Sequence, residues 1–282
     1  MVHVSEVNIE QRFAGFLQLA MAMVDAQAGM PVPDGCGWQV DRQALAKQFT
    51  FHLHAIHTLS GGSTLLIRGA HAQYLDHGSI KVLARSAVEA YIVFAYIFGD
   101  TRDDVNRYRH LTWVFGGLMD RQKHTATLAE SRQKQETERV QVDQIRAEIE
   151  RDPLFLQLAE KSRKLLIKKA DWSMGLQWHE LAVAVGFNEQ YFRNMYSYLC
   201  GYSHSSYAAA LQVRDARTYE VQQQLANAIL TMLVFVMAHF LTRYAGMFES
   251  AAHLLADSPE RQWVERFKFT SADLEAFYNS QP

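Results

Sequence analysis

The chain has 282 residues, of which 49% are hydrophobic and 21% are charged, as in a globular protein rather than a disordered one. Its formal net charge of -2 gives no overall positive field, so nucleic-acid binding would require a local basic patch. Five prolines and fifteen glycines are too few for a sandwich or barrel with many turns.

In the first third of the chain, apolar residues recur at helical spacing. The helices predicted there are 6–28, 41–59 with Asp41 as N-cap, 65–74, and 80–98 with Ser79 as N-cap. The helix 80–98 is apolar on almost every side, which is typical of a buried central helix. Its Lys81, Arg85 and Glu89 argue against a membrane span.

The rest of the chain shows the same helical spacing. The predicted helices are 103–121, 130–151, 154–170 after an Asp152–Pro153 start, a short one around 179–182, one begun by Asn188, 219–246, one with Trp263 and Phe267, and a last one capped by Ser271. In 219–246 the unbroken apolar core is too short to cross a bilayer comfortably, so we expect a second central helix.

Two of these predicted helices have unusual charge patterns. In 130–151, charges of both signs surround a thin apolar stripe, Val142, Ile145 and Ile149. This pattern favours a solvated helix that projects from the body, with a coiled-coil partner as the alternative. The helix 154–170 ends in lysines, including Lys168 and Lys169, and cations are favoured at a helix C-terminus; a phosphate-binding patch is the alternative.

Together these elements predict an all-α protein. We expect a single domain over 1–282, a bundle of roughly eight to ten helices around the apolar helices 80–98 and 219–246. Its core would span about 41–246, with 130–151 projecting and further helices in 257–282. No stretch alternates as strands do.

A polar site is predicted inside this apolar framework. Arg85 and Glu89 are four residues apart and share one helix face. One carboxylate cannot satisfy five guanidinium donors, and the densest supply of hydroxyl and imidazole groups is the segment 196–206. We therefore expect Arg85, Glu89, Tyr196 and His204 to form one polar cluster. The alternative is a structural ion pair that fixes helix register.

Helical spacing brings further residues to this cluster. Tyr196, Cys200 and His204 are four residues apart, and they share a face with Arg193 if the helix continues through Gly201. The candidate catalytic residues are Arg85, Glu89 and His204. The candidate binding residues are Arg193, Tyr196, Cys200, Ser203 and Ser205.

Motifs for metals and cofactors give weaker signals. The histidines His52, His54 and His57 have no cysteine or carboxylate nearby to complete a ligand set, so we expect no metal site. No phosphate loop, nucleophile elbow or dinucleotide fingerprint occurs, and we expect no cofactor. The chain has two cysteines far apart in sequence, Cys36 and Cys200, and no signal-peptide pattern. We therefore expect a cytoplasmic protein with free thiols and no membrane association.

The order and spacing of several motifs resemble a bacterial all-helical domain family of unknown function, over about residues 50–245. The motifs are Arg85-Ser86-x-x-Glu89, Trp172-Ser173, Glu180-Leu181-Ala182, Gly186, and Tyr196-x-x-Leu199 followed by His204-Ser205. Cys200 stands where the family commonly has a serine.

That family is similar in turn to HEPN domains, helical bundles that include toxin and defence ribonucleases. The resemblance implies metal-independent ribonuclease or nucleotide-binding activity, with RNA or a nucleotide as partner. The usual HEPN signature, an arginine four to six residues before the histidine, is absent before His204. The alternative is a non-catalytic module that binds a ligand or protein and forms homo-oligomers.

Overall fold

The structure is a computed structural model that describes residues 8–269 and 272–273. Thirteen α-helices and one two-stranded hairpin lie in this part of the chain, so the protein is all-α as predicted. There are more helices than the eight to ten expected, partly because the predicted helix 154–170 is two short helices. The predicted cap Ser271 lies outside the described residues.

Contacts divide the chain into two compact units. The first unit contains residues 1–94 and 186–282, and the second contains residues 95–185. The single domain over 1–282 stays a prediction, and each unit is described by itself.

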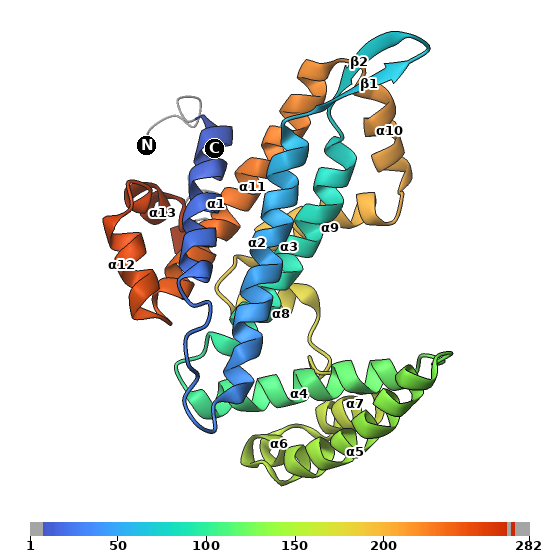
Figure 1. The fold of residues 1–282 in the computed structure, drawn as a ribbon, viewed down its shortest axis with the longest axis vertical. Helices are drawn as coiled ribbons and strands as arrows, with labels where there is room; N and C mark the ends of the chain where they lie inside the picture. The colour runs from blue at the N-terminus through green and yellow to red at the C-terminus, as the bar shows by residue number, and fades with distance from the viewer. Residues whose placement is uncertain (1–7, 270–271, 274–282) are drawn as a thin grey trace. The chain divides into compact units, whose positions relative to one another are not determined.

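The first unit is a bundle in which α1, α2, α3 and α11 run side by side (Figure 1). Its elements are α1 (Ile9–Asp25), a 3-10 turn (Gly37–Gln39), α2 (Val40–Ser60), β1 (Ser63–Ile67), β2 (Ala70–Tyr74), α3 (His77–Phe98, as far as residue 94), α9 (Glu189–Ser203), α10 (Tyr207–Asp215), α11 (Tyr219–Ala245), α12 (Glu249–Asp257) and α13 (Arg261–Phe267). Aromatic rings fill its centre: Phe240 of α11 lies 4.7 Å from Phe49 of α2 and 5.5 Å from Phe94 of α3, between ring centroids. Such pairs add to the apolar area that the helices bury.

Among the described helices, α11 alone is long and apolar enough to cross a membrane by length and composition. More than half of that apolar window, 56%, is buried inside the structure. Its Phe240 and Tyr244 pack on Phe94 of α3, as expected of a central helix in a bundle.

The second unit contains the end of α3 and five further helices. These are α4 (Asp103–Gln122), α5 (Ala129–Arg151), α6 (Pro153–Gln157), α7 (Glu160–Lys169) and α8 (Trp178–Ala184). The helix expected to project, α5, lies against α4, and its stripe residues Val142 and Ile149 are buried in a core with Phe115. Its outer face is charged and solvated as predicted, but the thin apolar stripe is covered.

The predicted helix 65–74 is wrong, because this segment is the antiparallel hairpin β1–β2. Its two-residue turn has left-handed backbone at both positions, with φ of 50° at Arg68 and 83° at Gly69. Positive φ at both central residues is the geometry of a tight hairpin turn, in which glycine is favoured. The dipeptide Arg68-Gly69 and the branched residues Thr64 and Ile67 were the missed signals.

Helix starts were predicted with mixed success. Asp41 is in the first turn of α2 rather than at its N-cap. Ser79 is likewise in the first turn of α3, because the carboxylate of Asp76 accepts its backbone N–H at 2.9 Å and acts as the cap. The Asp152–Pro153 start of α6 and the Asn188 cap of α9 are confirmed.

Candidate functional site

Polar side chains occupy every fourth position of α3: His77, Lys81, Arg85 and Glu89. This spacing places them along one helix face, and hydrogen bonds join that face to α9. They form two groups. We call Arg85, Glu89, Tyr196 and His204 the outer cluster, and His77, Lys81, Tyr198, Tyr202 and Gln212 the inner cluster.

In the outer cluster, a tyrosine and a carboxylate hold the Arg85 guanidinium. Its Nε donates to Glu89 Oε1 at 2.8 Å, and its Nη2 donates to the Tyr196 hydroxyl at 3.4 Å. The Tyr196 hydroxyl donates in turn to Glu89 Oε1 at 2.6 Å. The three groups form a closed triangle that fixes the direction of the guanidinium.

His204 completes the outer cluster from the C-terminus of α9. The helix does continue through Gly201, and His204 is the residue that caps it. The imidazole Nε2 lies 3.4 Å from Nη1 of Arg85, and the histidine is exposed. The clustering predicted from sequence is therefore confirmed, although the side chains of Arg85 and Glu89 are 22% and 25% exposed, so the site is wet at its edge.

The cluster leaves part of Arg85 unused. A guanidinium has five N–H donors, and the bonds to Glu89, Tyr196 and His204 use three of them. In the described part of the chain, two donors therefore remain for a ligand. A guanidinium with two available donors beside an exposed imidazole is suited to an oxyanion such as phosphate.

Electrostatics keeps two members of the outer cluster, Tyr196 and Arg85, each in one charge state. Burial raises the pKa of Tyr196, and its hydrogen bond to Glu89 raises it further, so the phenol stays protonated. Burial alone would lower the pKa of Arg85, but its bonds to Glu89 and Tyr196 raise it overall. Arg85 therefore presents a permanent positive charge.

The other predicted binding residues differ in their placement. Arg193 is exposed, and its guanidinium pairs with Glu189 at 2.8 Å on its own helix. Cys200 is a half-buried free thiol one turn before His204. Ser203 and Ser205 flank His204, and Ser205 has a left-handed φ of 50°, which is uncommon for a residue other than glycine.

The inner cluster was missed from sequence. The Lys81 side chain is fully buried, and its Nζ donates to the Tyr202 hydroxyl and to Gln212 Oε1, both at 2.9 Å. It also lies 3.0 Å from His77 Nδ1 and 4.1 Å from the centre of the Tyr202 ring. In the sequence, Lys81 argues only against a membrane span; the four-residue spacing of polar groups on α3 was the signal that could have found the inner cluster.

No carboxylate lies within ion-pair distance of the Lys81 amine in the described residues. Burial consequently lowers the pKa of Lys81 to about 8. Burial also lowers the pKa of His77, and the nearby Lys81 charge lowers it further. The histidine can then accept a hydrogen bond from the lysine at neutral pH.

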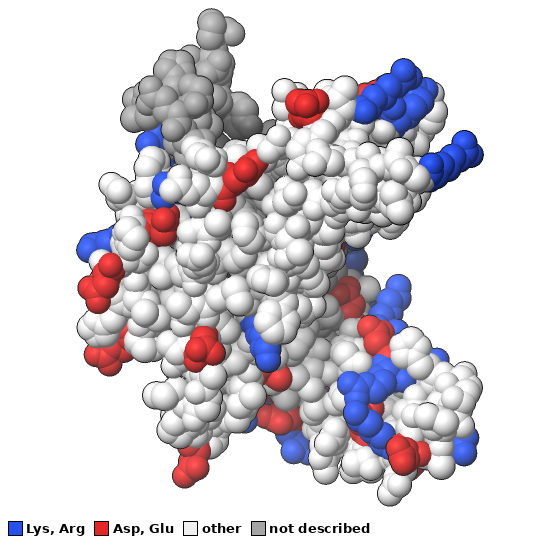
Figure 2. Space-filling model, turned by 45° about the horizontal axis from the view of Figure 1, so that its top comes forward, with Lys and Arg blue, Asp and Glu red and all other residues white. Residues whose placement is uncertain are grey.

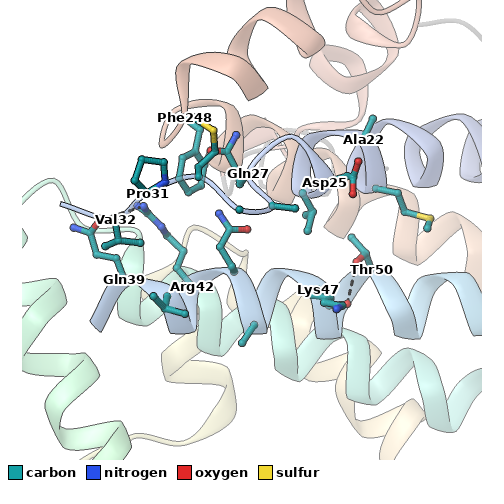
Figure 3. Close-up of a pocket in the computed structure, with 18 of the residues that line it drawn as sticks. Ala22, Asp25, Gln27, Pro31, Val32, Gln39, Arg42, Lys47, Thr50 and Phe248 are labelled. Carbon is teal, nitrogen blue, oxygen red and sulfur yellow. Dashed lines mark hydrogen bonds between the residues drawn. The ribbon is translucent and has the colours of Figure 1, made fainter. Parts of the chain in front are cut away.

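A separate groove lies between α1, the loop that follows it, and α2 (Figure 3). Its volume is about 870 Å³, and its lining is mostly apolar, with Pro31, Val32 and Phe248 converging on it. Two residues of α2, Arg42 and Lys47, supply positive charge to the groove. The Arg42 guanidinium lies 4.2 Å from the centre of the Phe248 ring. This groove is large enough for a small ligand.

The described part of the chain contains no group of three or more His, Cys, Asp or Glu side chains that could hold a metal ion. The histidines His52, His54 and His57 all lie on α2. Burial lowers the pKa of His52.

The model of a family of unknown function, DUF5677, matches residues 49–218. The chain belongs to this family. The matched segment covers more than half of the chain and includes both clusters, whereas most of the groove lies before it. Searches among curated proteins and among solved structures gave no match. Membership of the DUF5677 family agrees with the predicted resemblance to a helical family of unknown function; the relation to HEPN domains stays a prediction.

Proposed function

We propose that the outer cluster binds a phosphodiester of RNA and cleaves it without a metal ion. The observation that carries this proposal is the pairing of Arg85 Nη1 with the exposed His204 Nε2 at 3.4 Å. An arginine with two available donors can hold the phosphate. The neighbouring imidazole can move a proton on the same group.

The reaction follows from these two roles. When the bound phosphate takes over the Nη1 donor of Arg85 that otherwise faces His204, the neutral His204 Nε2 is released and accepts the proton of the ribose 2′-hydroxyl while the 2′-oxygen attacks the adjacent phosphorus. The bond from phosphorus to the 5′-oxygen breaks, and that oxygen takes a proton from a water molecule; the hydroxide that remains is neutralised by the proton on the His204 imidazolium, which restores the neutral base. The products are a 2′,3′-cyclic phosphate and a 5′-hydroxyl. Arg85 stabilises the charge that develops on the phosphoryl oxygens, and Glu89 and Tyr196 orient its guanidinium.

This arrangement offers a reason for the missing HEPN signature. The arginine is supplied from α3, 119 positions before the histidine, rather than from the same helix. RNA is the partner that we propose, and a reducing compartment such as the cytoplasm suits the two free cysteines, Cys36 and Cys200.

The first test is cleavage of an end-labelled single-stranded RNA in the presence of EDTA. The wild-type protein should produce cyclic-phosphate ends, and His204→Ala should lower the rate by a factor on the order of 100 to 10,000. Arg85→Ala should lower it comparably. The matched control is His253→Ala, which removes an exposed histidine of α12 and should leave the rate unchanged. Equal cleavage by wild type and His204→Ala, or no cleavage by wild type, would refute the proposal.

The groove favours a second candidate function, non-catalytic binding of an elongated apolar ligand with an anionic end. The apolar lining would hold the chain of the ligand, and Arg42 and Lys47 would attract its charge. Dodecanoate should raise the melting temperature of the protein in proportion to the logarithm of its concentration. Ala44→Trp should fill the groove and abolish this shift, whereas Ala252→Trp, on exposed α12, should keep it. No shift with the wild-type protein would eliminate this candidate.

A further inference from the structure

The inner cluster contains a buried group that is costly to desolvate. The Lys81 amine is fully buried without a carboxylate partner. A buried ammonium costs several kcal/mol relative to water unless it is paired, and an apolar side chain of similar volume often gives equal or higher stability. The proposed cleavage reaction does not use this lysine, so its cost requires another explanation.

We infer that Lys81 is a positioning residue, which fixes the end of α9 and the start of α10 so that His204 stays beside Arg85. This inference rests on the proposed function. It assigns to the inner cluster a role in keeping the outer cluster assembled.

Two hydrogen bonds of Lys81 connect α3 to α9 and to α10. Lys81 lies one turn before Arg85 on α3, and its amine donates to the hydroxyl of Tyr202, two residues before His204. The same amine donates to Gln212 of α10, the helix that begins directly after the loop of residues 204–206. One group on α3 thus holds the chain on both sides of His204.

Packing alone holds α10 weakly. This helix buries a single side chain, Ala209. Gln212 Oε1, by contrast, accepts hydrogen bonds from Lys81, from Tyr202 and, at 2.8 Å, from Tyr198. Polar bonds of the inner cluster are therefore the main attachment of α10 to α9 and α3, and the position of the loop between them depends on those bonds.

A positioning role and a purely structural role predict different outcomes. If Lys81 only stabilises the fold, a variant should lose activity in proportion to the loss of folded protein. If Lys81 positions His204, replacing it with methionine should slow the reaction even in the molecules that stay folded, because Tyr202 and Gln212 lose the donor that they share. A displacement of about 1 Å in a catalytic group is enough for a rate loss on the order of 100-fold.

The experiment compares Lys81→Met and Gln212→Leu with the wild-type protein. We expect both variants to lower kcat on a short single-stranded RNA by about 100-fold, with a smaller change in KM because Arg85 still binds phosphate. We also expect both variants to be folded at the assay temperature, so that kcat is compared per folded molecule. Lys123→Met, which removes an exposed lysine of the second unit, is the control and should match wild type in both measurements.

A second measurement does not require ribonuclease activity. The NMR signal of the His204 ring Cε1–H should shift in Lys81→Met and in Gln212→Leu, and stay in place in Lys123→Met. Wild-type kcat with an unmoved His204 signal in both variants would overturn the inference, as would an activity loss that merely follows unfolding. Full activity of His204→Ala would instead refute the proposed ribonuclease function, and the NMR comparison would still test whether Lys81 positions His204.

Discussion

The Lys81 ammonium makes stability depend on pH in a predictable direction. Its pKa in the folded protein is about 8, below its ordinary value of 10.5, so the unfolded chain binds this proton more tightly. Between these two pH values the unfolded state carries more protons, and the free energy of unfolding therefore rises with pH, by about 3 kcal/mol in total. Below pH 8, Lys81 is protonated in both the folded and the unfolded state, so this increase in the free energy of unfolding is absent.

Urea denaturation at pH 7.5 and pH 10, on wild type and Lys81→Met, checks this prediction. The variant should lack the rise that is due to Lys81, and ionisations elsewhere cancel in the comparison. Burial raises the pKa of Tyr198 and Tyr202, so these tyrosines lower the free energy of unfolding towards pH 10, but they do so in both proteins and cancel in the comparison; burial lowers the pKa of His77, so it stays neutral across this range. Identical pH dependence in the two proteins would show that the lysine is not desolvated.

At the same scale, the outer cluster was predictable and the inner cluster was not. Arg85 and Glu89 are four residues apart, and a guanidinium in an apolar helix has to find more partners, for which only one polar segment was available. The four-residue spacing of polar groups pointed to Lys81, but its partner Gln212 could not be found from sequence, since it is 131 positions away in an ordinary amphipathic stretch. The left-handed φ of Ser205 belongs to the Schellman motif that ends α9, in which the N–H of Ser206 donates to the Gly201 carbonyl at 2.8 Å and the N–H of Ser205 donates to the Tyr202 carbonyl at 3.3 Å.

At the scale of elements, most helices follow from apolar periodicity and capping residues, and the hairpin shows where that reasoning fails. Leu65, Leu66 and Ile67 are compatible with a helix or a strand, and all three are exposed, so burial does not choose between them. The turn decides. Two consecutive left-handed residues cannot be part of a helix, and they direct the chain back on itself.

The turn also provides a prediction. Arg68 adopts a φ of 50°, which asparagine tolerates better, and Asn-Gly is the preferred dipeptide for this turn. Arg68→Asn should therefore stabilise the hairpin by about 0.5–1 kcal/mol, measured as slower amide hydrogen exchange in β1 and β2. Gly69→Ala, at a φ of 83°, should act in the opposite direction by about 1 kcal/mol. Unchanged exchange in both variants would mean that the turn does not limit opening.

At the scale of the whole molecule, composition and the absence of alternating patterns were enough to predict an all-α protein. The two compact units were not predictable, because a helix has the same apolar period whichever core it joins. Charge is balanced at this scale as well: basic and acidic side chains are scattered among uncharged ones on the face in Figure 2, in keeping with the net charge of -2. An RNA substrate would then be recognised at Arg85 itself, with little long-range attraction.

The distance along the chain between Arg85 and His204 has a consequence for synthesis. The two residues are 119 positions apart, and ribosomes add about 5–20 residues per second. Roughly 6–24 s therefore pass between the translation of the arginine codon and that of the histidine codon. The whole second unit is made in this interval. Under the proposed function, the chain could not attack RNA, its own message included, until most of it had been translated.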